Sequence, residues 1–263
     1  MPDIALRGVR LHYQLDGPTD GTPIVLSNSL SSNLNMWDAQ VPALTAAGWR
    51  VLRYDNRGHG RSEAAPGPYA LDQLVDDMAA LLDVAGFERA HFCGLSLGGM
   101  VGQRAGTRHA ARLVSLTLCD TAAYMGPPEM WAERMAAVEQ GGMAALVDGT
   151  INRWFTPAGQ ARLPETVATI RAAILATSPA GYLGCCAAIR DMDQREAIAG
   201  IRLPTHVIVG ADDAGTPVSA AEFIHQRIAG SRLTVIPEAA HLANVEQAAA
   251  FNATLLGFLE TQR

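Results

Sequence analysis

The sequence predicts an α/β fold in which a mainly parallel, doubly wound sheet is interrupted by an all-helical insertion. Short apolar runs alternate with amphipathic helical patterns in the first and last parts of the chain, which is the pattern of helices covering a parallel sheet. Between residues 123 and 197 the periodicity is helical and no strand is convincing. We therefore expect a core of residues 1–122 and 198–263 with a helical cap of residues 123–197.

The composition is that of a globular chain that binds neither nucleic acid nor a membrane. Of 263 residues, 49% are hydrophobic and 17% charged, enough apolar material for a sizeable core. The formal net charge is −6 and no basic stripe occurs, so a nucleic-acid partner is not expected. The first residues lack a signal-peptide pattern and no apolar run reaches about 18 residues. We expect a cytoplasmic protein whose four cysteines are free and buried.

The elements before residue 123 follow from periodicity and turn residues. Two antiparallel strands flank Gly8, and the remaining apolar runs end in polar loops. The strands are expected at 4–6, 9–15, 24–27, 49–54, 90–93 and 113–119, and the helices at 37–47, 71–85 and 97–109.

The later elements comprise four cap helices and a return to the sheet. Prolines stand near the starts of the cap helices, where they are tolerated because the first N–H groups lack intrahelical acceptors. The cap helices are expected at 127–140, 142–154, 164–177 and 179–190. They are followed by strands at 204–209 and 232–236 and helices at 218–228 and 245–260.

Polar residues close several of these strands. Ser29, Asp55, Ser96 and Asp120 each come directly after an apolar run or within a few residues of it. Ligands of doubly wound sheets bind beyond the carboxyl ends of the strands, so we expect one site there. The glycine-rich turn at 55–62 is interpreted as architectural, with its arginine available to pair with carboxylates.

Ser96 has the setting of a nucleophile on a sharp turn. The run Gly94-Leu95-Ser96-Leu97-Gly98 separates a strand from a helix, which is the context that the G-x-S-x-G elbow requires. Side chains two residues before or after the serine would clash, so glycine is expected at both positions. The Leu97 N–H at the helix start and the Leu30 N–H after the early strand are the expected oxyanion donors.

A serine nucleophile needs a base, and His241 is the candidate. It lies in the loop between the last strand and the closing helix, the place of the histidine in the order serine, acid, histidine. His59 is the one serious rival, but it is better explained as part of a turn.

The acid that orients this histidine is left with three candidates. Asp213 follows the first strand after the cap and is favoured. Asp120, at the end of the preceding strand, is an alternative, because some hydrolases of this architecture place the acid there. Asp212 is the third.

Taken together, these motifs resemble the α/β-hydrolase superfamily over the whole chain, and within it the 3-oxoadipate enol-lactonases of the β-ketoadipate pathway. The superfamily motifs are Tyr54 to Ser62, the Ser96 elbow, Gly210-x-x-Asp213 and the final-loop His241. Most of the superfamily has His-Gly where this chain has Asn28-Ser29. The segments similar to enol-lactonases are 27–30, 36–38, 90–96, 118–123, 142–147 and 153–157. That family often has asparagine at the position of Asp120, which favours Asp213 as the acid.

The resemblance implies an α/β-hydrolase fold and a serine hydrolase that opens 3-oxoadipate enol-lactone, with no cofactor and no metal. The small-molecule substrate is an anionic lactone, and its free carboxylate should be met by a cation or hydrogen-bond donors from the cap. Trp131 and Arg134 are three residues apart and share a helix face. Further expected substrate contacts are Ser29, Arg153, Trp154 and Arg190.

Other functions remain open from the sequence. A broader carboxylesterase or perhydrolase would use the same serine, and a carbon–carbon bond hydrolase would share the triad. A haloalkane dehalogenase is disfavoured because its nucleophile would be aspartate at the position of Ser96. A non-catalytic ligand-binding protein on this fold is the alternative from another class, and the intact Ser96, Asp213 and His241 argue against it.

Overall fold

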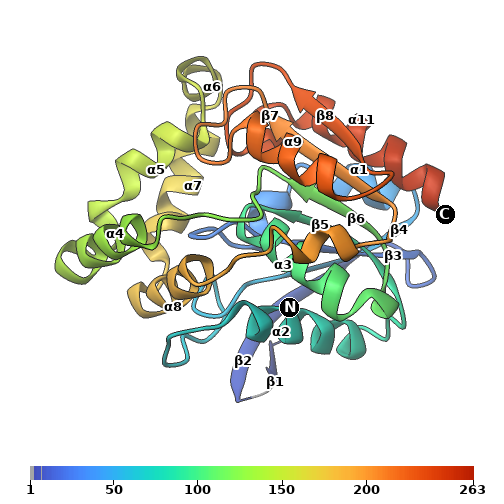
Figure 1. Ribbon diagram of the computed structural model, residues 1–263, viewed down its shortest axis with the longest axis horizontal. Helices are drawn as coiled ribbons and strands as arrows, with labels where there is room; N and C mark the ends of the chain where they lie inside the picture. Colours follow the sequence, from blue (N-terminus) through green and yellow to red (C-terminus); the bar gives the residue numbers. More distant parts are fainter. Residues whose placement is uncertain (1–2, 7) are drawn as a thin grey trace.

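The computed structural model describes residues 3–6 and 8–263, and these form an eight-stranded sheet covered by helices (Figure 1). The strand order is β1-β2-β4-β3-β5-β6-β7-β8; β1 and β2 pair antiparallel to their neighbours and all later pairs are parallel. The expected α/β class is confirmed. The strands are β1 Asp3–Leu6, β2 Val9–Asp16, β3 Thr22–Ser27, β4 Trp49–Tyr54, β5 Ala90–Leu95, β6 Leu113–Cys119, β7 Thr205–Gly210 and β8 Arg232–Ile236.

Helices cover both faces of this sheet (Figure 1). On one face, Gln40 just before α1 donates a hydrogen bond to Asn252 in α11 over 2.9 Å. On the other face, α2 and α3 lie side by side and Arg104 pairs with Asp72 between them over 2.5 Å. The core helices are α1 Val41–Ala46, α2 Leu71–Val84, α3 Leu97–Arg108, α9 Val218–Arg227, α10 Ala243–Glu246 and α11 Ala248–Leu259.

Two core helices differ from expectation. The helix expected at 37–47 is a 3-10 turn, η1 Leu34–Trp37, followed by α1, because Pro42 has no N–H to donate and therefore occupies the first turn of the helix. The continuous helix expected at 245–260 is also wrong. The chain leaves helical geometry at Gln247, with φ −124° and ψ 52°, and resumes as α11 and a final 3-10 turn, η5 Glu260–Gln262.

The segment between β6 and β7 is helical and stands over the end of the sheet where the parallel strands finish (Figure 1). The helix expected at 142–154 is divided, and a short helix that sequence reasoning missed follows it. An isolated antiparallel bridge between Tyr124 and Asp193 joins the two ends of the segment. The domain limits at 123 and 198 stay a prediction. The helices are α4 Pro128–Gly141, η3 Gly142–Ala145, α5 Val147–Trp154, α6 Pro157–Arg162, α7 Pro164–Ala176 and α8 Pro179–Arg190, with η2 Ala110–Arg112 and η4 Ala197–Gly200 in the core.

The turn at 55–62 is where α8 meets the core. Gly58 has φ +70°, and a Cβ there would lie 2.1 Å from the Cα of Gly181 in α8. Arg57 is buried and forms an ion pair with Asp77 of α2, with Nη2 2.8 Å from Oδ1. His59 is buried in the same turn, and its Nδ1 lies 2.9 Å from the carbonyl oxygen of Arg57. The turn therefore anchors the helical segment, in agreement with its architectural interpretation.

Within the part of the chain that the structure describes, no single helix has the length and apolar composition of a membrane span; α7 and α8 meet both criteria only as a pair bent by 92°.

Candidate active site

Ser96 occupies the junction between β5 and α3 in a strained conformation. Its φ of 57° and ψ of −114° are unusual for a residue with a side chain. Two hydrogen bonds hold the backbone there: Ser96 N–H donates to the carbonyl of Cys119 over 2.9 Å, and the Thr121 hydroxyl donates to the Ser96 carbonyl over 2.8 Å. Strain of this kind persists where the surroundings fix the backbone, and it is concentrated at functional sites.

The glycines that flank Ser96 are required by contact distances. A Cβ at Gly94 would lie 2.3 Å from the carbonyl oxygen of Gly98. A Cβ at Gly98 would lie 2.1 Å from the carbonyl oxygen of Ser27 in β3. The crowding expected from the sequence is confirmed at both positions.

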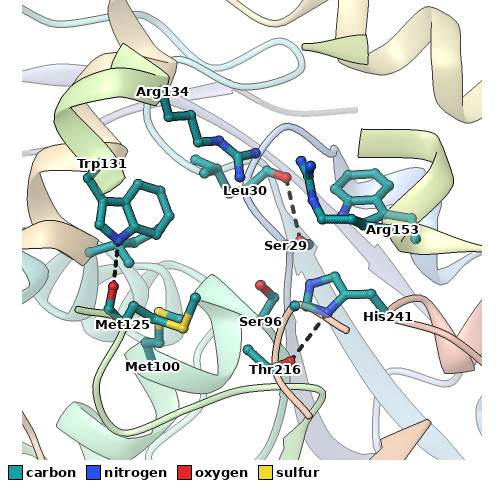
Figure 2. A pocket seen from close by; sticks show the side chains of 13 residues that line it. Ser29, Leu30, Ser96, Met100, Met125, Trp131, Arg134, Arg153, Thr216 and His241 are labelled. Atoms are coloured by element: carbon teal, nitrogen blue, oxygen red, sulfur yellow. Dashed lines mark hydrogen bonds between the residues drawn. The ribbon is translucent and has the colours of Figure 1, made fainter. Parts of the chain in front are cut away.

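Asp213 and His241 meet from two separate loops, after β7 and after β8. His241 Nδ1 lies 2.8 Å from Asp213 Oδ2. Because an ionised carboxylate only accepts hydrogen bonds, Nδ1 carries a proton, and Nε2 is the nitrogen that can accept one from Ser96. The Thr216 hydroxyl donates to the same carboxylate oxygen over 2.6 Å and lies 3.3 Å from Nδ1 (Figure 2).

The surroundings of Asp213 keep it ionised. Its other oxygen accepts the N–H groups of Gly215 and Thr216 over 2.8 and 3.0 Å. Burial acts to raise the pKa of Asp213, but the charge and hydrogen bond of His241 and the Thr216 bonds outweigh it, so the pKa is lowered. A permanent negative charge beside Nδ1 stabilises the imidazolium that forms when Nε2 takes a proton.

Ser96 and His241 face the same pocket, with the hydroxyl beside the imidazole (Figure 2). Among the described residues, no hydrogen bond joins the Ser96 hydroxyl to Nε2. Such contacts are often long without substrate and shorten when it binds. The arrangement can therefore transfer a proton from hydroxyl to imidazole once the substrate closes the site.

The two alternative acids have other environments. Asp120 is buried and accepts a hydrogen bond from the Gly210 N–H over 2.8 Å. Burial, followed by the charge of Asp213, raises the pKa of Asp120 well above its ordinary value. Asp212 is exposed. Of the three candidates, the structure brings Asp213 to His241.

The two expected oxyanion donors lie at the rim of the elbow. Leu97 is the first residue of α3, where a backbone N–H has no intrahelical acceptor. The loop that carries Leu30 is joined to α3 by a hydrogen bond from Gly98 N–H to the Asn28 carbonyl over 3.0 Å. Leu30 lines the same pocket as Ser96 (Figure 2). In the described chain no hydrogen bond uses the Leu30 N–H.

Two arginines from the helical segment reach the pocket. Arg134 lies over the rings of Trp131 and Tyr182, with 5.6 Å from Cζ to each centroid, and donates a hydrogen bond to the Tyr182 hydroxyl. Arg153 points toward it from the other side (Figure 2) and donates to the Thr150 hydroxyl over 3.3 Å. Burial, and then the charge of Arg134, lowers the pKa of Arg153.

Neither guanidinium has a carboxylate partner among the described residues. Every other element of the site is neutral or is paired, as Asp213 is with His241. Two adjacent positive charges without a counter-ion form a site for an anion.

The described residues include no cluster of three or more His, Cys, Asp or Glu side chains that could hold a metal ion.

The remaining expected contacts divide into those inside the pocket and one outside it. Ser29 lines the pocket and donates to the Leu30 carbonyl over 3.4 Å. Trp154 stacks on the His241 ring at 6.4 Å between centroids and 27° between planes. Arg190 does not line the pocket; it pairs with Asp191 at the surface over 2.7 Å. The expectation for Arg190 is therefore wrong.

A family model described as alpha/beta hydrolase fold matches residues 22–248. The chain belongs to the α/β-hydrolase family. Two proteins of Acinetobacter baylyi, 3-oxoadipate enol-lactonases 2 and 1, are 37% and 38% identical to it; the matches cover 95% and 97% of this chain and 92% and 95% of theirs. The crystal structure of the enol-lactonase from Burkholderia xenovorans LB400 matches with a TM-score of 0.95 and 43% identity, over 98% of this chain and all of that one.

Sequence reasoning missed two parts of this hydrolase site. Thr216 contacts both Asp213 and His241. Its place just before a proline was only a weak indication that it belongs to the site. Glu246, a buried carboxylate in α10, accepts hydrogen bonds from the Ala240 N–H over 2.8 Å and from Thr156. An acidic residue within an apolar helical pattern gives no sign of such partners, because Thr156 comes from a segment 90 residues away and Ala240 from the loop before the helix.

Proposed function

We propose that this protein is a serine hydrolase that opens 3-oxoadipate enol-lactone to 3-oxoadipate. The names of the relatives from Acinetobacter baylyi and Burkholderia xenovorans support this substrate. The observation that carries the proposal is the pair of guanidiniums, Arg134 and Arg153, without carboxylate partners in the pocket of Ser96 and His241. A neutral ester would leave both charges unused, whereas the lactone carries a carboxylate for them.

The first half of the reaction forms an acyl-enzyme. His241 Nε2 takes the Ser96 proton while Oγ attacks the lactone carbonyl, and Asp213 stabilises the imidazolium. The N–H groups of Leu30 and Leu97 receive the negative charge on the carbonyl oxygen. The ring C–O bond then breaks, and the enol oxygen leaves. It takes the proton from His241, and the enol becomes a ketone that stays tethered to the acyl group.

The second half regenerates the serine. Water attacks the acyl carbonyl while His241 accepts its proton, and the same two N–H groups hold the second oxyanion. The bond to Ser96 Oγ breaks, the proton returns to that oxygen, and the dicarboxylate product leaves. This sequence uses only the residues named and one water molecule.

The positive charges have a second role in this scheme. Arg134 and Arg153 hold the carboxylate arm, and so fix the lactone carbonyl against Ser96. The Trp131 ring, packed on Arg134, supports the position of that guanidinium. For the compartment, we infer the cytoplasm, which is supported by four free, buried cysteines.

The test compares anionic and neutral substrates in Arg134→Gln and Arg153→Gln. A hydrogen bond to a charged group contributes about 1.5–3 kcal/mol, so kcat/KM for the enol-lactone should fall by about 10- to 150-fold, mainly through KM. Hydrolysis of p-nitrophenyl acetate should change less than threefold, or about 0.7 kcal/mol. Arg190→Gln is the matched control and should change neither. Equal losses on both substrates would contradict the anionic lactone and favour a broader carboxylesterase.

A further inference from the structure

A second, larger cavity lies next to the active-site pocket, and Trp154 stands between them. The pocket that contains Ser96 has a volume of about 70 Å³, whereas the neighbouring cavity has about 580 Å³. Of all the described residues, Trp154 alone lines both. Its indole is therefore a shared wall.

The position of this wall is fixed by contacts on the catalytic side. Trp154 ends α5 and is only 5% exposed. Its ring stacks on the His241 imidazole, and its carbonyl accepts a hydrogen bond from the Leu242 N–H over 3.1 Å. A side chain packed in this way on a catalytic base does not swing aside without disturbing that base.

The chemistry of the second cavity differs from that of the first. The arginines that face the lactone are absent from its lining. Part of its lining, from α7 and the segment around α10, is apolar, and several of these residues are alanines whose small side chains leave the space open. These apolar lining residues are Ile170, Ala172, Ala173, Ala176, Leu242 and Val245. The polar lining residues are Ser32, Asn33, Asn35, Asp38, Thr166 and Thr169. The apolar part of the lining suits an unbranched alkyl chain.

We propose that Trp154 is the residue that limits hydrolysis to small substrates, by closing the active-site pocket against this apolar cavity. The inference rests on ester hydrolysis at Ser96 as proposed above, but not on the identity of the lactone. A short ester or a five-membered lactone reaches Ser96 with Trp154 in place. A longer acyl chain meets the indole before its carbonyl reaches the serine.

The test is a chain-length series in Trp154→Ala, from p-nitrophenyl acetate to hexanoate. Each methylene buried from water contributes a factor of about four to binding, and hexanoate has four more methylenes than acetate. The hexanoate-to-acetate ratio of kcat/KM should rise at least tenfold over that of the wild type. An unchanged ratio would overturn the proposal. Trp154→Leu, which leaves less of a void, should show a smaller rise if the alanine variant does not fold.

Two further variants distinguish an opening between the two cavities from a general loosening of the helical segment. Ile174 is buried in α7 and lines neither cavity, so Ile174→Ala should lower the melting temperature and leave the ratio unchanged. Refilling the second cavity with Ala173→Leu in the Trp154→Ala background should return the ratio toward the wild-type value. A rise in the Ile174 variant, or no reversal on refilling, would contradict the role of Trp154. If the wild-type protein hydrolysed neither esters nor the lactone, the proposed function itself would be contradicted.

Discussion

Glu246→Gln tests whether the helical segment holds the catalytic histidine in place. The Glu246 side chain is buried, with 3% of the residue exposed, and its carboxylate acts only as a hydrogen-bond acceptor. One oxygen accepts the Thr156 N–H over 3.0 Å and the Thr156 hydroxyl over 2.5 Å, and the other accepts the Ala240 N–H over 2.8 Å. Ala240 precedes His241, and Thr156 follows the Arg153-Trp154 pair by two residues. Glu246 therefore joins the histidine loop to the pocket wall.

The size of the effect follows from the donors that face the carboxylate. An amide has one oxygen, so in either orientation of the variant side chain an N–H group faces a donor in place of an acceptor. A buried donor without an acceptor costs about 1–3 kcal/mol. If the activation free energy of the reaction rises by the same amount, kcat falls by about 5- to 150-fold. Because Trp154 and Arg153 are held through the same contact, KM for the lactone should rise as well.

The assay is steady-state hydrolysis across pH, with thermal unfolding measured alongside. We expect the fall in kcat to persist well below the melting temperature, where the variant is fully folded. Glu260→Gln is the matched control: it makes the same chemical change at an exposed ion pair with Arg263, and should alter neither constant. A variant with a lowered melting temperature but wild-type kcat and KM would refute the positioning role and leave Glu246 a structural residue.

Three further variants follow from the same geometry. Asp213→Asn should lower kcat by about 10³- to 10⁴-fold with little change in KM, because the amide favours the wrong tautomer of His241; a loss below tenfold, measured with the enol-lactone, would argue against the triad. In Asp120→Asn, the free energy of unfolding relative to the wild type should increase with pH by about 1.4 kcal/mol per pH unit, between the ordinary pKa of aspartate and the raised pKa of Asp120. Over that range the folded wild-type carboxyl stays protonated while the unfolded one ionises. A difference in urea unfolding that does not change with pH would contradict this. Gly98→Ala should yield little folded protein by circular dichroism, because its Cβ would lie 2.1 Å from the Ser27 carbonyl oxygen; a stable, active variant would show that the elbow is less crowded than described.

The sequence predicted best those features that local chemistry determines. The strand Leu113–Cys119 has the bounds expected from its apolar run, and α2 differs from expectation by one residue, because periodicity and flanking turns set both. The Ser96 elbow was visible for the same reason: only glycine fits beside it, so steric demand is recorded in the sequence. His241 followed from its place after the last strand, and Asp213 was favoured as the acid over Asp120 and Asp212.

Features that depend on distant contacts were not predictable. Nothing local distinguishes Arg153, which reaches the pocket, from Arg190, which pairs with its own neighbour at the surface. Helix α6 is only six residues long, and its N-terminal cap, Thr156, also binds Glu246 across the fold. The break at Gln247 likewise separates the part of the last helix that contacts the pocket wall from the part that covers the sheet.

Covalent labelling tests the central claim most directly, namely that Ser96 is a nucleophile activated by His241. The wild-type protein is treated with a p-nitrophenyl alkylphosphonate and the modified peptide is mapped by mass spectrometry. We expect one adduct, on the Ser96 hydroxyl, which forms far more slowly in His241→Ala. An adduct on a different residue, or continued enol-lactone hydrolysis by Ser96→Ala at the wild-type rate, would contradict the account.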